Sequence, residues 1–176
     1  MSELEIKFLT FRVYRFSDTK AFRRLHTLLS TRVRRYIAFR VNRSEDADEL
    51  TSEVFLRAWE YMTTHKVENL IALLFKMSRN MIADHYRKSG RTVPLTPAAE
   101  ANLMDPGSIV QDAQLQEEYA ELLAVMKGLK SEYQDVLRMR YLEEMSTEEI
   151  AEALDKTANA TRVLLHRAKS ALKKKM

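Results

Sequence analysis

The sequence predicts an all-α protein: two small helical domains joined by a flexible linker. Glycine and proline are scarce, with three of each, and five of the six lie between Gly90 and Gly107. The rest of the chain is rich in Leu, Ala, Glu, Arg, Lys and Met, which cost least in a helix. Alternating β-branched runs with tight turn signals are missing. We therefore expect domains at residues 1–90 and 114–176, with a linker at 91–113.

Four helices are expected in the first domain. Asp18 is a suitable N-cap for the second helix, and Ser44 with two acids in the first turn indicates the start of the third. The first segment is apolar on several sides, so a strand is the rival interpretation there. The expected ranges are Leu4–Phe16, Asp18–Phe39, Ser44–Tyr61 and Glu68–Lys88.

Four more helices are expected after the linker, at Val110–Lys127, Glu132–Leu142, Thr147–Leu154 and Ala158–Lys174. Ser131 and Thr157 are the expected caps of two of them. Ser146 and Glu149 have the spacing of a capping box. Only two residues, Asp155 and Lys156, separate the last two helices. Two short helices joined by a tight turn, the second one basic, are typical of a helix-turn-helix.

The last helix has an apolar stripe and an adjacent basic stripe. Thr161, Leu165, Ala168 and Leu172 share the first, and Arg162, His166, Lys169 and Lys173 share the second. A basic stripe is often only a solvated surface. The capped helix before it, the short turn and the lack of acids after residue 155 favour DNA binding.

Charge is distributed unevenly along the chain. Residues 1–43 hold eleven basic side chains against three acidic ones, and residues 156–176 hold seven basic and no acidic ones. Residues 115–155 reverse this balance, with eleven acidic and four basic side chains, and residues 92–114 contain no lysine or arginine. The net charge of +4 hides these local fields, which can steer a protein toward a polyanion.

Several classes of function are disfavoured by the composition. The chain has no cysteine, which excludes disulfides and thiolate metal sites. The four histidines lie on separate elements, and no phosphate-binding loop or nucleophile motif is present. We therefore expect no metal, no cofactor and no catalytic residues. The acidic amino terminus does not resemble a secretory signal, and no apolar run approaches the length of a membrane span. A cytoplasmic protein without membrane insertion is expected.

Three segments carry a resemblance to a known family. Asp46–Trp59 and Leu74–Arg87 resemble region 2 of bacterial sigma factors of the sigma-70 family, extracytoplasmic-function group. Glu148–Leu154 with Arg162–Ala168 is similar to the region 4 helix-turn-helix of the same group. The order and spacing agree over nearly the whole chain. The resemblance implies an alternative sigma factor, not itself an enzyme, that binds core RNA polymerase, recognises −35 and −10 promoter elements and promotes DNA melting.

The resemblance also implies a role for individual positions. A carboxylate-rich helix face would bind the β′ clamp of core polymerase, and the β flap is a second polymerase contact. The fourth helix and the loop before it would engage the −10 element, and the last helix would enter the major groove at the −35 element. The implied polymerase-binding residues are Asp48, Glu49, Ser52 and Glu53. The −10 residues are Lys66, Arg79, Asn80, Asp84, Arg87 and Lys88. The −35 residues are Thr157, Asn159, Arg162, Val163, His166, Arg167 and Lys169.

Four positions depart from the family pattern. Ser52 stands where glutamine is frequent, and Leu73 stands where tryptophan is frequent. Asp155 occupies a turn position that is often glycine, and Thr161 replaces a buried valine. The last two are expected to cost the helix-turn-helix about 1 kcal/mol, through a left-handed turn residue and a buried hydroxyl.

Two other functions fit part of the pattern. One is a DNA-binding regulator that uses the helix-turn-helix without polymerase. The other is a helical adaptor or decoy that binds polymerase or a signalling partner but no promoter. An anti-sigma protein is a further partner implied by the family. The linker is also long enough for the two domains to pack on each other and hide their DNA-binding surfaces.

Overall fold

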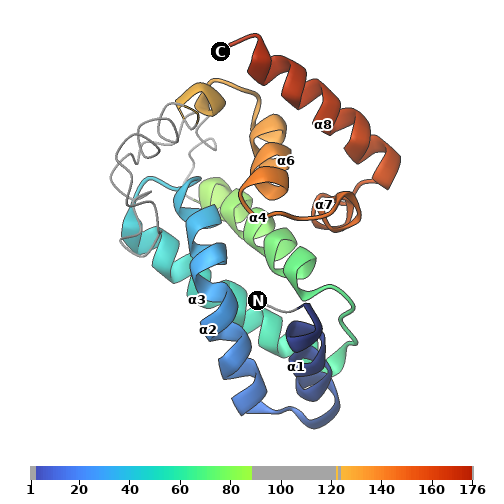
Figure 1. Ribbon diagram of the computed structural model, residues 1–176. Coiled ribbons are helices and arrows are strands. Elements are labelled where there is room, and N and C mark those ends of the chain that lie inside the picture. The colour runs from blue at the N-terminus through green and yellow to red at the C-terminus, as the bar shows by residue number, and fades with distance from the viewer. Residues whose placement is uncertain (1–2, 89–121, 123, 176) are drawn as a thin grey trace, which may run out of the picture.

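The computed structural model describes residues 3–88, 122 and 124–175, and the elements of this part are helices. This confirms the all-α prediction. Most of the helix predicted at 110–127, and the whole predicted linker, lie outside the described residues. The helices are α1 (Glu3–Phe16), α2 (Thr19–Ala38), α3 (Ser44–Thr64), α4 (Leu70–Lys88), α6 (Ser131–Tyr141), α7 (Thr147–Ala153) and α8 (Ala158–Lys173) (Figure 1).

The first four helices form a bundle in which α2 packs against α1, α3 and α4. The buried stripe of α2 includes Leu25, Leu29, Val33 and Tyr36, at intervals of four, four and three residues. This spacing places all four side chains on one helix face. The first segment, for which a strand was the rival interpretation, is the helix α1, and it buries Ile6, Leu9, Thr10 and Val13.

Local capping chemistry sets several helix ends. The Asp18 carboxylate accepts hydrogen bonds from the backbone N–H groups of Lys20 and Ala21, as predicted. The fourth helix begins two residues later than predicted, because the side chain of Asn69 accepts from the N–H of Ala72 at 3.0 Å and acts as the cap.

Two of the expected starts differ in detail. Ser131 was predicted to cap α6, but it is the first residue of the helix, and its hydroxyl accepts a hydrogen bond from Arg40 at 2.9 Å. Similarly, Ser44 is the first residue of α3 rather than its cap, and its hydroxyl accepts from Arg34. In both cases an arginine from α2 or the residues after it takes the serine oxygen that a capping bond would use.

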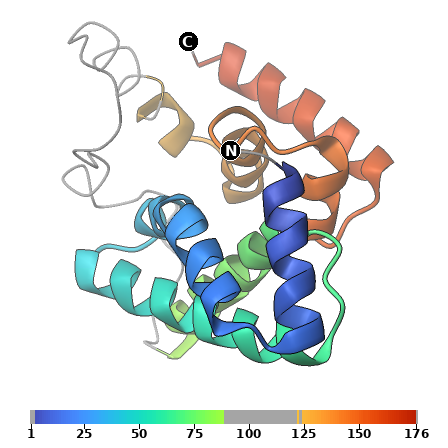
Figure 2. The same ribbon diagram turned by 60° about the horizontal axis from the view of Figure 1, so that its bottom comes forward.

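The last three helices pack against one another, and α7 also lies on α4 (Figures 1 and 2). Buried side chains of both groups form one continuous apolar cluster, from Ile6 in α1 to Ala168 in α8. None of the described helices combines the length and apolar character that crossing a membrane requires.

Candidate nucleic-acid and polymerase interfaces

A short turn joins α7 to α8, and side chains fix both of its ends. Ser146 and Glu149 form the predicted capping box at the start of α7, with reciprocal hydrogen bonds of 3.1 and 2.7 Å. Thr157 caps α8 by accepting from the N–H of Ala160. Between them Asp155 adopts a positive φ of 53°, the left-handed conformation expected for this turn position. The predicted helix-turn-helix is therefore present.

Helix α8 has one buried and one exposed face. Thr161, Leu164 and Ala168 are buried, whereas Leu165, which the predicted stripe contained in place of Leu164, is only half-buried. The predicted stripe was therefore rotated by one position near its centre. The −35 residues are all on the solvent side: Thr157, Asn159, Arg162, Val163, His166, Arg167 and Lys169 are exposed.

Few contacts hold the exposed side chains of α8. Arg162 lies 3.4 Å from the Glu148 carboxylate, in a pair whose side chains are both more than half exposed. Lys169 lies over the Tyr141 ring at 5.7 Å. Because exposed pairs of this kind contribute little to stability, these side chains can exchange their partners for DNA at low cost.

The −10 residues predicted on α4 follow one side of that helix. Asn80 and Arg87 are exposed and seven residues apart, and Asp84 accepts a hydrogen bond from Arg87 at 2.7 Å. Lys88 is exposed at the helix end. Arg79, in contrast, is half-buried against α7. Lys66 lies apart from these residues, in the loop before α4, where it pairs with Glu68.

The predicted polymerase-binding residues share the outer face of α3. Asp48 pairs with Arg34 at 2.6 Å and Glu53 pairs with Arg57 at 2.8 Å, while the Ser52 hydroxyl donates to the backbone oxygen of Asp48. Glu49 is exposed and makes no ion pair with any described residue. Of the four residues, Glu49 therefore presents the least neutralised charge to a basic partner.

A groove of about 560 Å³ between α3 and α4 connects two of these sets. Sequence reasoning assigned the sets separately and did not predict this common groove. Glu49, Ser52 and Glu53 line it from α3, and Asp84 and Lys88 line it from α4. A partner bound to the acidic face of α3 would thus lie next to the −10 residues of α4.

Comparison with known proteins identifies both halves of this arrangement. The family described as Sigma-70 region 2 matches residues 21–92, and Sigma-70, region 4 matches residues 119–172. The chain belongs to the sigma-70 family. Within it, the chain is 30% identical over 154 residues to the ECF RNA polymerase sigma factor BldN of Streptomyces coelicolor, covering 86% of this chain. It is 27% identical over 128 residues to the ECF sigma factor SigM of Bacillus subtilis, covering 72% of this chain and 77% of SigM. These relatives place it in the extracytoplasmic-function group.

The structural comparison agrees at the level of the fold. CnrH, solved in complex with the cytosolic domain of CnrY, is similar with a TM-score of 0.69 and 18% sequence identity, over 96% of this chain and 95% of CnrH. The chain spans 58% of the length of BldN and 36% of the length of the probable sigma factor RfaY of Xanthomonas campestris.

Regions 2 and 4 of this sigma factor are joined by a buried polar contact that the sequence did not reveal. The Asp135 carboxylate in α6 accepts hydrogen bonds from Arg40 at 2.7 Å and from the Tyr36 hydroxyl at 3.0 Å. The Arg40 and Asp135 side chains are 6% and 7% exposed. Burial and the neighbouring charge of Asp135 raise the pKa of Tyr36, so this hydroxyl stays protonated and remains a donor.

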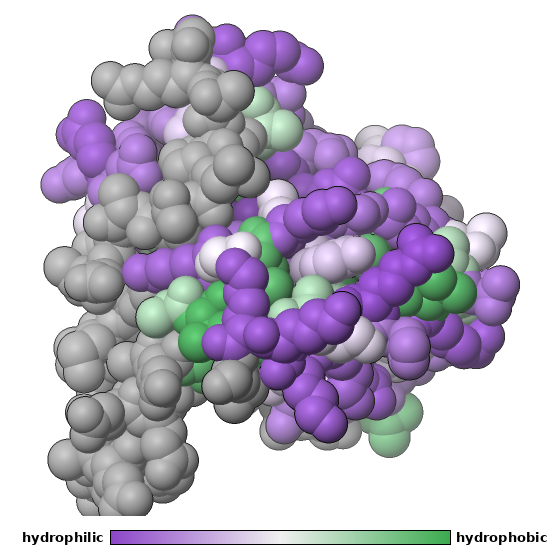
Figure 3. Space-filling model, turned by 90° about the horizontal axis from the view of Figure 1, so that it is seen from above, coloured by the Kyte–Doolittle hydropathy of each residue, from purple (hydrophilic) through white to green (hydrophobic). Residues whose placement is uncertain are grey.

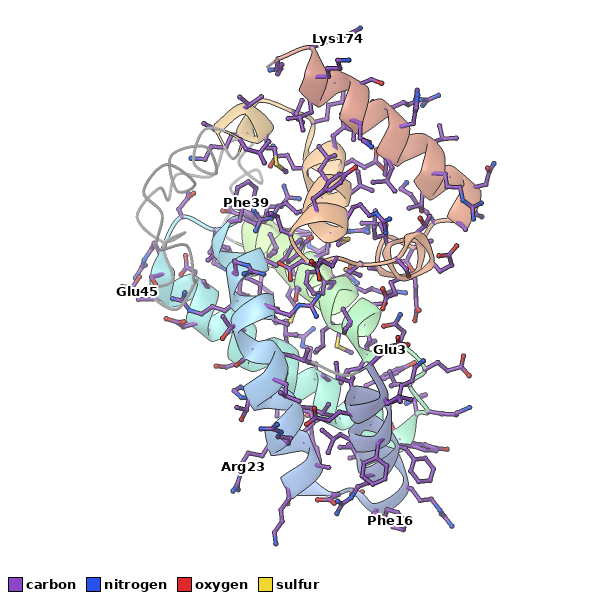
Figure 4. The ribbon with its side chains drawn as sticks, in the orientation of Figure 1. Glu3, Phe16, Arg23, Phe39, Glu45 and Lys174 are labelled. Carbon is purple, nitrogen blue, oxygen red and sulfur yellow. The ribbon has the colours of Figure 1, made fainter. Side chains whose placement is uncertain are left out.

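A second acid, Glu143, repeats this pattern after the end of α6. Its carboxylate accepts from Arg32 and Arg35, at 3.0 Å each, and its side chain is 1% exposed. Beside it the Arg138 guanidinium stacks 3.8 Å from the centre of the Phe39 ring, where α2 meets α6 (Figure 4). Part of the basic field of residues 1–43 is therefore neutralised by the acidic segment 115–155, rather than being free for a polyanion.

The expectation that the domains would hide their DNA-binding surfaces is met only in part. Regions 2 and 4 do pack on each other, and Arg79 lies in the contact, where its guanidinium is 3.5 Å from the backbone oxygen of Ala153. The −35 residues of α8, however, face solvent. Among the described residues, the packing thus reaches α4 and leaves the outer face of α8 open.

Region 4 also carries an apolar hollow of about 460 Å³ at its end away from α4. Figure 3 shows hydrophobic atoms exposed among hydrophilic side chains on the side of the molecule that α8 crosses. Two lysines, Lys169 and Lys173, stand at the hollow, and its apolar lining consists of Leu122, Met126, Leu137, Tyr141, Leu142 and Leu172. No group of metal-ligating side chains lies within residues 3–88 or 124–175.

Proposed function

We propose that this chain is an alternative sigma factor: it binds core RNA polymerase, directs it to promoters through −35 and −10 recognition, and promotes opening of the duplex. The observation that carries the proposal is the exposed face of α8. All seven predicted −35 residues lie on it, and the opposite face is buried in a capped helix-turn-helix. Arginine side chains such as Arg162 and Arg167 suit bidentate guanine recognition or phosphate contacts in the major groove.

Region 2 supplies the polymerase contact and the −10 contact. The acidic face of α3, with Glu49 as its least neutralised carboxylate, is complementary to a basic coiled coil on the β′ clamp. The exposed side of α4, with Asn80 and Arg87, would hold a strand whose bases have left the duplex stack, and Lys66 would approach it from the loop. Contacts that favour unstacked bases over paired ones shift the equilibrium toward the melted promoter.

Region 4 supplies a second polymerase contact. The apolar hollow beside Lys169 and Lys173 has the dimensions and lining of a site for an apolar segment, and we assign it to the β flap. Bond formation belongs to the polymerase, so the sigma factor itself needs no catalytic residue and acts in the cytoplasm. The anti-sigma partner implied by the family stays a prediction, with its binding face unassigned.

Co-elution with core RNA polymerase on a sizing column at moderate salt tests the proposal. We expect stoichiometric co-elution of the native chain and its loss when Asp48 and Glu49 are both changed to lysine. The matched control is Glu144→Lys, a charge reversal at an exposed position of region 4 outside the hollow and the interdomain contact. Co-elution that survives the double reversal on α3, or a native chain that never co-elutes, would contradict the proposal and favour a regulator that works without polymerase.

A further inference from the structure

Helix α7 is a strongly acidic element that lies on the basic side of region 2. Glu148, Glu149 and Glu152 lie within its seven residues, and Asp155 follows in the turn. The helix packs against α4, and both views of the ribbon show it close to the beginning of α1 (Figures 1 and 2). Carboxylates of region 4 are thus held over a part of region 2 to which no role has been assigned above.

Basic groups of region 2 meet this acidic element directly. The Lys76 ammonium lies 2.5 Å from the Asp155 carboxylate, and Arg79 reaches the backbone oxygen of Ala153. The pKa of Lys7 in α1 is raised mainly by its hydrogen bond and ion pair with Glu3, and Glu149 adds a smaller effect of the same sign. Partial desolvation raises the pKa of Glu152, against the opposing charge of Lys76. Three cations of region 2 therefore lie in the field of α7.

Lys76 also belongs to the side of α4 that carries the −10 residues. It stands four residues before Asn80 and eleven before Arg87, so all three lie on one helix face. Arg79 flanks the same face. A strand following this face from Arg87 toward the start of α4 would therefore reach the position that the Asp155 carboxylate occupies.

We propose that Lys7, Lys76 and Arg79 form a surface for the phosphate backbone of DNA, and that α7 occupies it as an internal competitor while regions 2 and 4 are packed together. Carboxylates and phosphates are both anionic acceptors for lysine and arginine, so one can replace the other. The pairs in this contact are half-exposed, with Lys76 and Asp155 at 39% and 53%, and such pairs are weak and sensitive to salt. A polyanion that makes several contacts at once can displace them.

Assigning the polyanion to promoter DNA rests on the proposed function, but the competition itself does not. It requires only that removing charge from α7 frees the surface. The buried contacts of Asp135 and Glu143 hold region 4 in place, whereas the carboxylates of α7 select what the surface can bind. Both roles can be tested separately with the full chain in the absence of polymerase.

The first experiment measures binding of the free full-length chain to a fluorescein-labelled oligothymidylate by anisotropy at low salt. The variant Glu152→Gln/Asp155→Asn removes two charges from α7 and its turn, and asparagine tolerates the positive φ at position 155. The control, Glu132→Gln/Glu144→Gln, removes two charges elsewhere in region 4. We expect the α7 variant to bind roughly fivefold or more tightly than the control, because three phosphate-binding cations are freed. Equal affinity of the two variants would overturn the competition.

The second experiment asks which cations take the phosphates. In the Glu152→Gln/Asp155→Asn background, Lys76→Gln should remove most of the gain and lower the slope of log affinity against log salt by about 0.7, the value for one contact to a single strand. Lys20→Gln, at an exposed lysine at the start of α2, is the matched control and should leave both quantities unchanged. Equal effects of the two lysine variants would overturn the assignment of Lys76.

Circular dichroism of each variant confirms that helix content is retained. Failure of polymerase co-elution with a positive result here would leave an intramolecularly masked DNA-binding surface without a sigma function. Normal co-elution with equal binding by the charge-matched variants would refute the internal competitor alone.

Discussion

At the scale of single residues, the helix-turn-helix contains two local departures from an optimal sequence, and both are visible in the structure. Asp155 takes a left-handed conformation without being glycine, and the hydroxyl of Thr161 is buried without a hydrogen-bond partner. A buried hydroxyl that makes no bond costs free energy, because it loses water and gains nothing in exchange. The sequence predicted both features, since the turn and the buried stripe follow from local pattern.

Replacing Thr161 by valine should therefore stabilise the protein by about 1 kcal/mol, because valine has the same shape and no polar group to desolvate. Thr157→Val is the matched control at the start of the same helix. It removes the cap of α8 and should destabilise the protein by about 1 kcal/mol. Urea unfolding followed by circular dichroism measures both values. A Thr161→Val protein less stable than the native chain would show that the hydroxyl has a favourable role.

Residue-level prediction worked where the partner is near in sequence and failed where it is far. The caps formed by Asp18, Ser146 and Thr157 were predicted because their partners lie two or three residues away. Asp135 and Glu143 were seen only as members of an acidic segment. Their arginine partners lie roughly a hundred positions earlier in the chain, and nothing in local spacing indicates which charges will meet.

At the scale of elements, the type of each helix followed from periodicity, and its ends followed from capping. The errors at the helix ends share one cause: a side chain expected to cap was taken by a tertiary contact, as with Ser131 and Arg40. The groove between α3 and α4 could not be predicted either. Its two walls belong to elements whose relative placement depends on packing rather than on the pattern of either helix.

The N-terminus of α2 gives a pH-dependent prediction. The pKa of Asp18 is lowered, chiefly because the backbone N–H of Ala21 donates to its carboxylate, with further contributions from Arg12 and Lys20. The folded protein therefore holds this proton less tightly than the unfolded chain. The stabilisation is present above the ordinary pKa of 3.8 and is lost as the pH falls through the lower folded value.

Asp18→Asn keeps a capping oxygen but loses the charge. We expect the native chain to have a higher Tm than this variant at neutral pH, and the difference to shrink below about pH 4, where the native carboxylate becomes protonated. Thermal unfolding at a series of pH values measures this. A difference in Tm that is constant from neutral pH to pH 3 would contradict the assignment of the effect to the Asp18 charge.

At the scale of the whole molecule, regions 2 and 4 are held together by charges removed from water. Removing one partner of such a pair leaves the other buried without compensation, which costs about 3–5 kcal/mol. Asp135→Ala would leave Arg40 in that situation, and separating the two regions would relieve it by exposing Arg40 to solvent. We therefore expect the variant to open rather than to unfold.

Small-angle X-ray scattering should show a larger radius of gyration for Asp135→Ala than for the native chain, with helix content unchanged by circular dichroism. Glu144→Gln, which removes an exposed charge from the same region, should scatter like the native chain. An unchanged radius of gyration for a folded Asp135→Ala protein would show that the apolar part of the contact alone holds the two regions together.

Promoter-dependent transcription tests the central claim most directly. Core RNA polymerase reconstituted with this chain would be used to select DNA from a random library, and run-off transcription would then be measured on the selected duplex. We predict a transcript that requires the chain and is strongly reduced by Arg162→Ala with Arg167→Ala, two exposed side chains whose loss leaves the α8 core intact. Failure of the holoenzyme to select any sequence, or a transcript indifferent to both arginines, would contradict the account of this protein as a promoter-reading sigma factor.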